Sequence, residues 1–182
     1  MNREEIQPKE LLMRYENIKP GDVVITGGRG AVANTVRFGT AGVRNMFNKD
    51  IATHVGIVIE IHGQLFIAEM KGGKGLQINS FKTYTKARRR WIIDIVRHPE
   101  MAEAKREMIQ MRIAKDYRYM LEYDTLGAIS FALPVEQCSE KEYCSEYVVT
   151  LFSHARIHTD LPDPVSPWDL QKLNLPSVNW RS

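Results

Sequence analysis

The stretch "CSEKEYCSEYVVTLFSHA", residues 138–155, places a cysteine where a helix is predicted to begin. Ser139 and Glu142 have the spacing of a capping box, so Cys144 falls in the first or second turn of that helix. Free backbone amides and the helix dipole lower the pKa of a thiol at such a position, and the thiolate is the form that attacks carbonyl groups. The backbone amide of Cys144 can also stabilise the resulting oxyanion. The apolar positions of the helix are Val148, Leu151 and Ala155.

A nucleophilic thiol needs a base, and the hairpin predicted in "THVGIVIEIHGQLFIAEM" offers a histidine with a carboxylate beside it. His62 and Gly63 form the predicted two-residue turn of this hairpin. In the resulting register Glu69 lies diagonal to His54, within the roughly 7–8 Å over which such neighbours interact. The opposite face is an apolar layer that pairs Val55, Ile57 and Ile59 with Met70, Ala68 and Phe66.

The other histidines and acidic residues are weaker candidates for the base and for the group that orients it, although no single residue establishes a catalytic site. His62 and Glu60 are rival groups for orienting His54, but Glu60 lies about 20 Å along the strand, which excludes direct contact. His98 precedes a proline, and two more histidines lie beyond or behind the cysteine helix. Taken alone, a strand-edge histidine is usually structural, and Cys144 could be a small buried apolar residue. Spacing alone does not bring residue 54 to residue 144.

Six motifs resemble, in this order, the circularly permuted branch of the NlpC-type cysteine peptidases, the YiiX-like group with a papain-like fold: "KPGDVVI", "ATHVGIVIE", "FIAEM", "YDTLGAISF", "YCSEYVVTLF" and "SPWDL". The similarity covers nearly the whole chain. It implies that Cys144 is the nucleophile, His54 the base and Glu69 the group that orients His54. It also implies that Tyr123 lines the site and assists the oxyanion, and that Asp22 holds a turn before the first strand.

The activity implied by this resemblance is hydrolysis of an amide bond through a thioester, in a peptide or a cell-wall-type fragment. Two other functions stay open: a lipid-directed acyltransferase or thioesterase of the lecithin:retinol acyltransferase-like type, and a non-catalytic binding module. Relatives of the first kind usually have a second histidine where this sequence has Glu69. Glu146 replaces the glycine of ordinary NlpC-type members, and an insert at residues 26–53 precedes the histidine.

The patterns and the resemblance together predict one α+β domain over residues 1–182. Its fold is expected to be a permuted papain-like one, with an antiparallel sheet or small barrel packed against helices and the nucleophile at a helix N-terminus. A helix is predicted from Pro99 to Tyr119, with Ala104, Met108 and Met111 towards the core. The remaining predicted segments are a helix within 1–17, a strand at 23–25, a helical turn or two at 32–38, strands in "GLQINS" and "RWIIDIVRH", and a proline-rich surface tail at 160–182.

Composition limits the partners and the compartment. At 182 residues the chain can build a core without disulfides, so both cysteines are expected to be reduced. No signal peptide or membrane span is recognisable, which predicts a soluble, cytoplasmic protein. The formal charge of +3 is partly concentrated in "FKTYTKARRRW", an isolated basic run that does not predict nucleic-acid binding.

The spacing of the chemistry-bearing residues predicts no metal site and no cofactor, because the histidines and cysteines do not fall at ligand spacings. The glycine-rich stretch after the first strand lacks the lysine-serine or lysine-threonine ending of a phosphate loop. The expected partner is therefore a small peptide, an amino-acid amide or an acyl substrate. The sequence gives neither the oligomeric state nor the physiological substrate.

Overall fold

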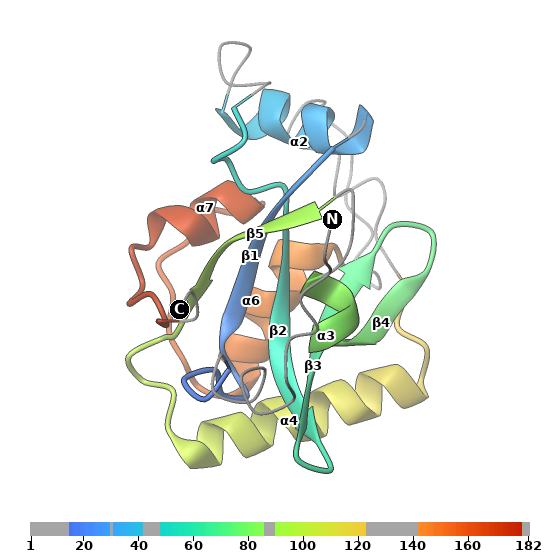
Figure 1. The fold of residues 1–182 in the computed structure, drawn as a ribbon, viewed down its shortest axis with the longest axis vertical. Helices are drawn as coiled ribbons and strands as arrows, with labels where there is room; N and C mark the ends of the chain where they lie inside the picture. Colours follow the sequence, from blue (N-terminus) through green and yellow to red (C-terminus); the bar gives the residue numbers. More distant parts are fainter. Residues whose placement is uncertain (1–14, 30, 42–47, 86–89, 123–141, 180–182) are drawn as a thin grey trace, which may run out of the picture.

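The computed structural model describes residues 15–29, 31–41, 48–85, 90–122 and 142–179. Five strands form one antiparallel sheet in the order β4-β3-β2-β1-β5 (Figure 1). The α+β class with an antiparallel sheet is therefore confirmed. The strands are β1 (Val23–Gly28), β2 (His54–Ile61), β3 (Gln64–Lys71), β4 (Gly75–Ser80) and β5 (Arg90–Val96).

The β2–β3 hairpin has the predicted register. Its turn residues His62 and Gly63 both have positive φ, 52° and 73°, as a tight two-residue hairpin turn requires. The pairs Ile57–Ala68 and Ile59–Phe66 lie directly opposite each other. Because side chains alternate between the two faces of a strand, this register puts the predicted apolar layer on one face, and the other face carries His54 and Glu69 together with the buried Val58 and Ile67.

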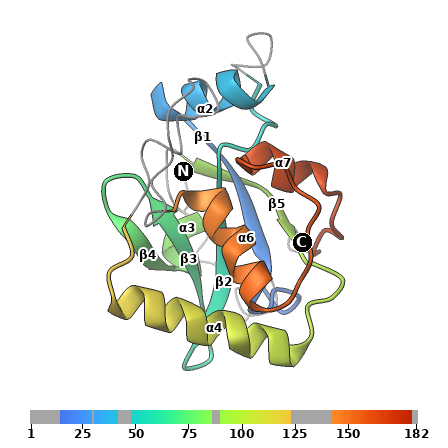
Figure 2. The same ribbon diagram turned by 180° about the vertical axis from the view of Figure 1, so that it is seen from behind.

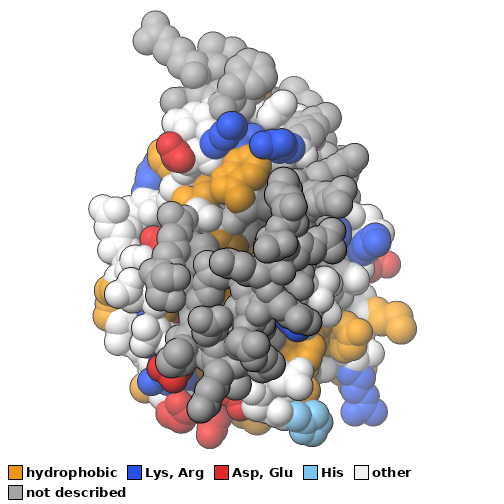
Figure 3. Space-filling model, viewed as in Figure 1, with side chains coloured by type: hydrophobic (Ala, Val, Ile, Leu, Met, Phe, Trp, Pro, Cys, Tyr) orange, Lys and Arg blue, Asp and Glu red, His pale blue; other side chains and the backbone are white. Residues whose placement is uncertain are grey.

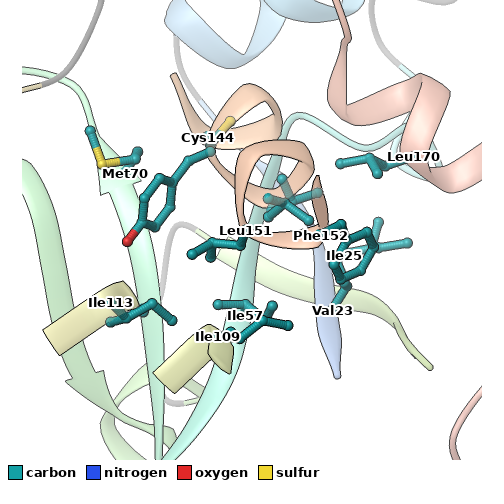
Figure 4. Packing of buried hydrophobic residues seen from close by; sticks show 14 of the residues in the cluster. Val23, Ile25, Ile57, Met70, Ile109, Ile113, Cys144, Leu151, Phe152 and Leu170 are labelled. Carbon is teal, nitrogen blue, oxygen red and sulfur yellow. The ribbon is translucent and has the colours of Figure 1, made fainter. Parts of the chain in front are cut away.

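Two helices cover one face of the sheet. α6 (Cys144–His154) lies over β2 and β3, and α4 (Glu103–Arg118) runs across the end of the same face (Figure 2). The largest buried apolar cluster fills the space between them, and Figure 4 shows its packing. A smaller cluster occupies the other face, where α3 (Phe81–Thr85) lies. The remaining helices are α2 (Ala31–Ala41), beyond the end of β1, and α7 (Pro167–Lys172), beside α6.

α4 differs from its prediction in its start and in its buried face. Pro99 lies in a turn, and the helix begins only at Glu103. Ala104 and Met111 are exposed, so the predicted core face is wrong for these two residues, while the half-buried Met108 does pack against the core. The residues that α4 buries are Arg106, Ile109, Ile113 and Asp116.

The two charged residues on this buried face explain the error. Arg106 donates through Nε to the carbonyl of Pro20 at 2.9 Å, and Asp116 accepts a hydrogen bond from the hydroxyl of Tyr147 at 3.2 Å. Asp116 also pairs with Arg112 one turn earlier. Buried polar groups are tolerated when they find such partners. Because the partners lie far away in the sequence, the hydrophobic pattern of α4 does not reveal them.

Some predicted features lie outside the described residues, among them Tyr123, Cys138, Ser139 and most of the helix predicted within residues 1–17. Residues 15–17 of that segment form a turn. The first strand extends beyond the predicted residues 23–25 to Gly28, and α2 is longer than the predicted turn or two. The strands predicted in "GLQINS" and "RWIIDIVRH" are β4 and β5, which confirms both predictions.

Candidate active site

The thiol stands at the start of α6, as the sequence predicts, because Cys144 is the first helical residue. Tyr143 precedes the helix, and its N–H donates to Oε2 of Glu146 at 3.4 Å. The capping box predicted from Ser139 and Glu142 is wrong, because Glu142 lies before the helix and Glu146 closes its first turn instead. Glu146 therefore stabilises the helix start.

The sulfur lies where β2 and β3 separate. Their paired register ends at Ile57 and Ala68, so the ladder does not reach the first residues of β2. The N–H of Val58 points towards β1, and because amides alternate in direction along a strand, the N–H of Val55 points towards β3. With no ladder partner there, the Val55 N–H donates to the sulfur of Cys144. The end of the hairpin thus provides a hydrogen-bond donor for the thiolate.

The imidazole of His54 lies between the sulfur and a carboxylate. Its Nε2 is 2.6 Å from Oε2 of Glu69, and its side chain also forms a hydrogen bond with Cys144. Because Nε2 faces the carboxylate, Nδ1 is the ring nitrogen that remains for the sulfur. The side chain of Glu69 is 2% exposed and that of His54 14% exposed. The structure therefore brings Cys144 to the His54–Glu69 pair, a step that spacing alone could not predict.

The environment of Cys144 favours the thiolate. Burial is the largest influence on the pKa of this thiol and acts to raise it, because a charge is poorly solvated in the interior. The positive charge and hydrogen bond of His54 act in the opposite direction, as do the N–H groups of Val55 and Ser145. Together they lower the pKa of Cys144 below its ordinary value. The arrangement thus supports a thiolate–imidazolium pair, the reactive form of a cysteine nucleophile.

Asn79 holds the carboxylate from the far side, and the sequence reading missed it. Its side-chain amide donates to Oε1 of Glu69 at 3.2 Å, while Oε2 faces His54. In the β3–β4 ladder, Ile67 pairs with Asn79 and Glu69 pairs with Gln77, so Asn79 is a diagonal neighbour of the carboxylate on the same face. The register of "GLQINS" against β3 is the signal that could have identified it.

The backbone just before and at His54 is fixed from two sides. Thr26 of β1 donates through its hydroxyl to the carbonyl of His54 at 3.1 Å. Gln171 of α7 accepts from the N–H of Ala52 and donates to the carbonyl of Asp50, both at 2.8 Å. The insert before the histidine is therefore tied to the C-terminal segment. That segment contributes to the interior as well as to the surface, since Val165, Ser166 and Leu170 are buried.

Asp22 supports the fold at the other end of β1, in agreement with the role expected for it. Its carboxylate is fully buried and pairs with Arg97, whose Nε lies 2.7 Å from Oδ1. Oδ2 also accepts the N–H of Lys19 at 2.8 Å, which closes the turn through Gly21. Gly21 has φ of 86°, a conformation that other residues rarely adopt.

His62, the rival group for orienting His54, is exposed in the hairpin turn, at the other end of β2 from His54.

A search against known protein families finds no match for this chain, and a search of curated proteins finds none. Among solved structures, the chain is similar to the crystal structure of the metalloprotein YiiX from Escherichia coli O157:H7. The TM-score is 0.55 at 15% sequence identity, over 88% of this chain and 86% of that chain. The chain has a YiiX-like fold. At this identity the likeness concerns the fold alone, so the chemistry of the site has to be argued from its own residues.

YiiX is described as a metalloprotein, which makes the metal-binding capacity of the present candidate site relevant. Within the described ranges, no group of three His, Cys, Asp or Glu side chains could hold a metal ion. Glu69 occupies Nε2 of His54, which leaves Nδ1 for Cys144, so the carboxylate and the thiol approach different atoms of the ring. The side chains of Cys144, His54 and Glu69 therefore do not fit a metal centre.

Among the described helices, none is long and apolar enough to cross a bilayer.

Proposed function

We propose that this protein is a cysteine hydrolase that cleaves an amide bond through a thioester intermediate. The observation that carries the proposal is the continuous hydrogen-bonded series from Cys144 through His54 to Glu69, with 2.6 Å between the ring and the carboxylate. A nucleophile, a base and a group that orients the base are the three components of thiol catalysis. Structural cysteines are inert when their surroundings are apolar, and this one faces an imidazole and two backbone amides.

In the first half of the reaction, the thiolate of Cys144 attacks the substrate carbonyl carbon and forms a C–S bond. The carbonyl oxygen becomes an oxyanion, which the backbone N–H of Cys144 at the helix start can stabilise. The imidazolium of His54 then gives its proton to the departing nitrogen as the C–N bond breaks. An amine leaves, and the acyl group remains on the sulfur as a thioester.

In the second half, neutral His54 takes a proton from a water molecule, and the resulting hydroxide equivalent attacks the thioester. Collapse of the tetrahedral intermediate breaks the C–S bond, releases a carboxylic acid and restores the thiolate. Throughout, Glu69 keeps the ring oriented and stabilises its positive charge. The substrate class, a peptide or a peptide-bearing cell-wall fragment, comes from the resemblance of the sequence motifs to the NlpC-type peptidases.

The proposal is tested by incubating the protein with a peptide pool and with digested cell-wall peptides, and by measuring newly formed amino groups and product masses. We expect turnover by the natural chain and none by Cys144→Ala, with both showing the same circular dichroism spectrum and melting temperature. Cys138→Ala is the matched control and should retain activity. Iodoacetamide below pH 7 should modify Cys144 in preference to Cys138.

Two outcomes would contradict this function. Equal modification of both cysteines, and only after denaturation, would show that Cys144 is an inert buried thiol. Transfer of an acyl chain from a labelled phospholipid to Cys144, with no cleavage of any peptide, would instead identify a lipid-directed acyltransferase or thioesterase. Intact-protein mass measurement distinguishes these cases, because the acyl chain adds a defined mass to the protein.

A further inference from the structure

A buried positive charge without a negative partner lies beyond the end of β1, in a part of the molecule that the proposed reaction does not use. Arg37 of α2 carries this charge and is 3% exposed. No carboxylate of the described residues pairs with Arg37, and its Nε lacks any hydrogen-bond partner. Burial lowers the pKa of Arg37, but a guanidinium stays protonated in proteins, so the charge persists in the interior. Buried charges are normally paired, and Arg37 therefore lacks an anion.

The groups that hold the guanidinium of Arg37 are neutral. Its Nη2 donates to the carbonyl of Gly28 at 3.0 Å, and its Nη1 donates to Oδ1 of Asn34 at 3.3 Å. The guanidinium carbon also lies 5.7 Å from the ring centre of Trp91. The indole in turn packs against the backbone of β1 at Gly27, where any larger side chain would collide with it. These contacts fix the plane of the guanidinium and leave its Nε edge for another acceptor.

The helix that carries Arg37 is only loosely attached to the sheet. Within the described residues, α2 makes few contacts with the other helices and strands. Segments with few contacts separate from their surroundings at low cost, so this part of α2 can make room for a ligand beside β1. The surface at this end is basic: Arg29, next to the end of β1, is exposed, and Figure 3 shows Lys and Arg side chains beside hydrophobic ones where α2 lies in Figure 1. Exposed cations attract anions to such a surface.

Charge and shape select the ligand of Arg37. One guanidinium balances one monovalent carboxylate, whose two oxygens match the planar N–H fork of arginine. A phosphate dianion would leave an excess of negative charge, because the other buried cation of the described residues, Arg106, lies at the far end of β1 beside Pro20. We propose that Arg37 anchors a carboxylate-binding site between α2 and the neighbouring ends of β1 and β5, for a small acid or a peptide with a free C-terminus. Such a site goes beyond the proposed hydrolase function and does not depend on it.

The test observes the Nε–H group of Arg37 by NMR in nitrogen-15-labelled protein, with Arg37→Lys to identify its resonance. The probes are N-acetylglycine and acetyl-trialanine, each compared with its C-terminal amide at the same chloride concentration. We expect the resonance to shift with the carboxylates and to stay in place with the amides. Half-saturation on the order of 1 mM is expected for one charge-assisted contact. At roughly ten times that concentration, the melting temperature should rise by about 3–6 °C.

Variants link this response to the guanidinium. Arg37→Met removes the charge and should abolish the rise in melting temperature with the carboxylates. Arg37→Lys keeps the charge but loses the planar fork, so its half-saturation should be about tenfold weaker. The matched control is Arg29→Met, which removes an exposed cation next to the end of β1 and should respond as the natural chain does. Cys144→Ala should also respond normally, so failure of the carboxylate site would leave the proposed hydrolase untouched, and the reverse is equally true.

The two acids distinguish the two sources of the carboxylate. A response to N-acetylglycine that equals or exceeds the response to acetyl-trialanine identifies a small acid, and tighter binding of acetyl-trialanine identifies a peptide end; either result supports the site. A resonance that no carboxylate moves, or equal shifts with acids and amides, would overturn the site and leave Arg37 as a structural residue of α2. A melting response that persists in Arg37→Met, or a shift with inorganic phosphate but with no carboxylate, would overturn it as well.

Discussion

The contact between Glu69 and His54 gives the sharpest test of the candidate site. Glu69→Gln keeps the size and the hydrogen-bonding capacity of the side chain but removes its negative charge. The thiolate–imidazolium pair should then become less populated, because the imidazolium loses its buried counter-charge 2.6 Å away. The pKa of Cys144 should rise, so the reactive thiolate should disappear at a higher pH as the solution is acidified.

The size of the effect can be worked out from the geometry. Two unit charges whose centres are about 4 Å apart interact by about 4 kcal/mol at an effective dielectric constant of about 20. About half of this should be lost on substitution, because His54 is 14% exposed and glutamine retains a hydrogen bond. A loss of about 2 kcal/mol corresponds to a roughly 30-fold smaller population of the ion pair.

The assay is the second-order rate of iodoacetamide modification of Cys144 from pH 5 to pH 9, which needs no substrate. At pH 6 we expect Glu69→Gln to react about 30-fold more slowly, and the two proteins to converge at high pH, where the thiol is ionised in both. Glu60→Gln is the matched control, since it removes an exposed carboxylate from the same hairpin. Superimposable profiles for Glu69→Gln and the natural chain would refute the reasoning.

Two further predictions concern the groups that support the site and the fold. Asn79→Ala should slow iodoacetamide modification of Cys144 at pH 6 by about threefold to tenfold, which corresponds to the loss of one hydrogen bond to Glu69. Gln77→Ala, on the same strand, is the control and should leave the rate unchanged. Equal effects of the two substitutions would contradict a specific contact between Asn79 and the carboxylate. Arg97→Met should lower the free energy of unfolding in urea by about 3–5 kcal/mol, because it leaves the carboxylate of Asp22 buried without its cation. Lys172→Met breaks an exposed pair and should change the free energy of unfolding by less than about 1 kcal/mol. A similarly small loss for Arg97→Met would mean that the Arg97–Asp22 pair does not stabilise the turn.

Local features of the fold could be predicted from the sequence. The β2–β3 hairpin is specified by its two-residue turn and by the alternation of apolar residues, since a slip by one residue would bury Glu69 among them. That register predicted the proximity of Glu69 to His54, which the structure bears out. The start of α6 is also a local feature, although the capping residue that closes it, Glu146, follows the cysteine instead of preceding it.

Features that depend on distant partners could not be predicted in this way. The buried face of α4 includes Arg106 and Asp116, whose partners come from the turn before β1 and from α6. The role of Asn79 depends on the register between β3 and β4, which are joined by a longer, glycine-rich turn. Cys144 and His54 are 90 residues apart in a chain of 182, and only the resemblance to a known family suggested that they meet.

Two features of the fold act together on the Cys144 thiol. One is the separation of β2 from β3 near His54, and the other is the start of α6 at Cys144. The Val55 N–H donates to the sulfur of Cys144 instead of to a carbonyl of β3, so a backbone–backbone hydrogen bond of about 0.5–1.5 kcal/mol is replaced by one to a side chain. The exchange becomes favourable when the sulfur is charged, because hydrogen bonds to ionised groups are stronger. Burial alone would raise the pKa of the thiol, and the positive charge of His54, with the hydrogen bonds of His54, Val55 and Ser145, reverses that effect. A hairpin paired to its end would remove the Val55 donor, and a helix begun one turn earlier would remove the free amides at Cys144, so either change would raise the pKa of the thiol.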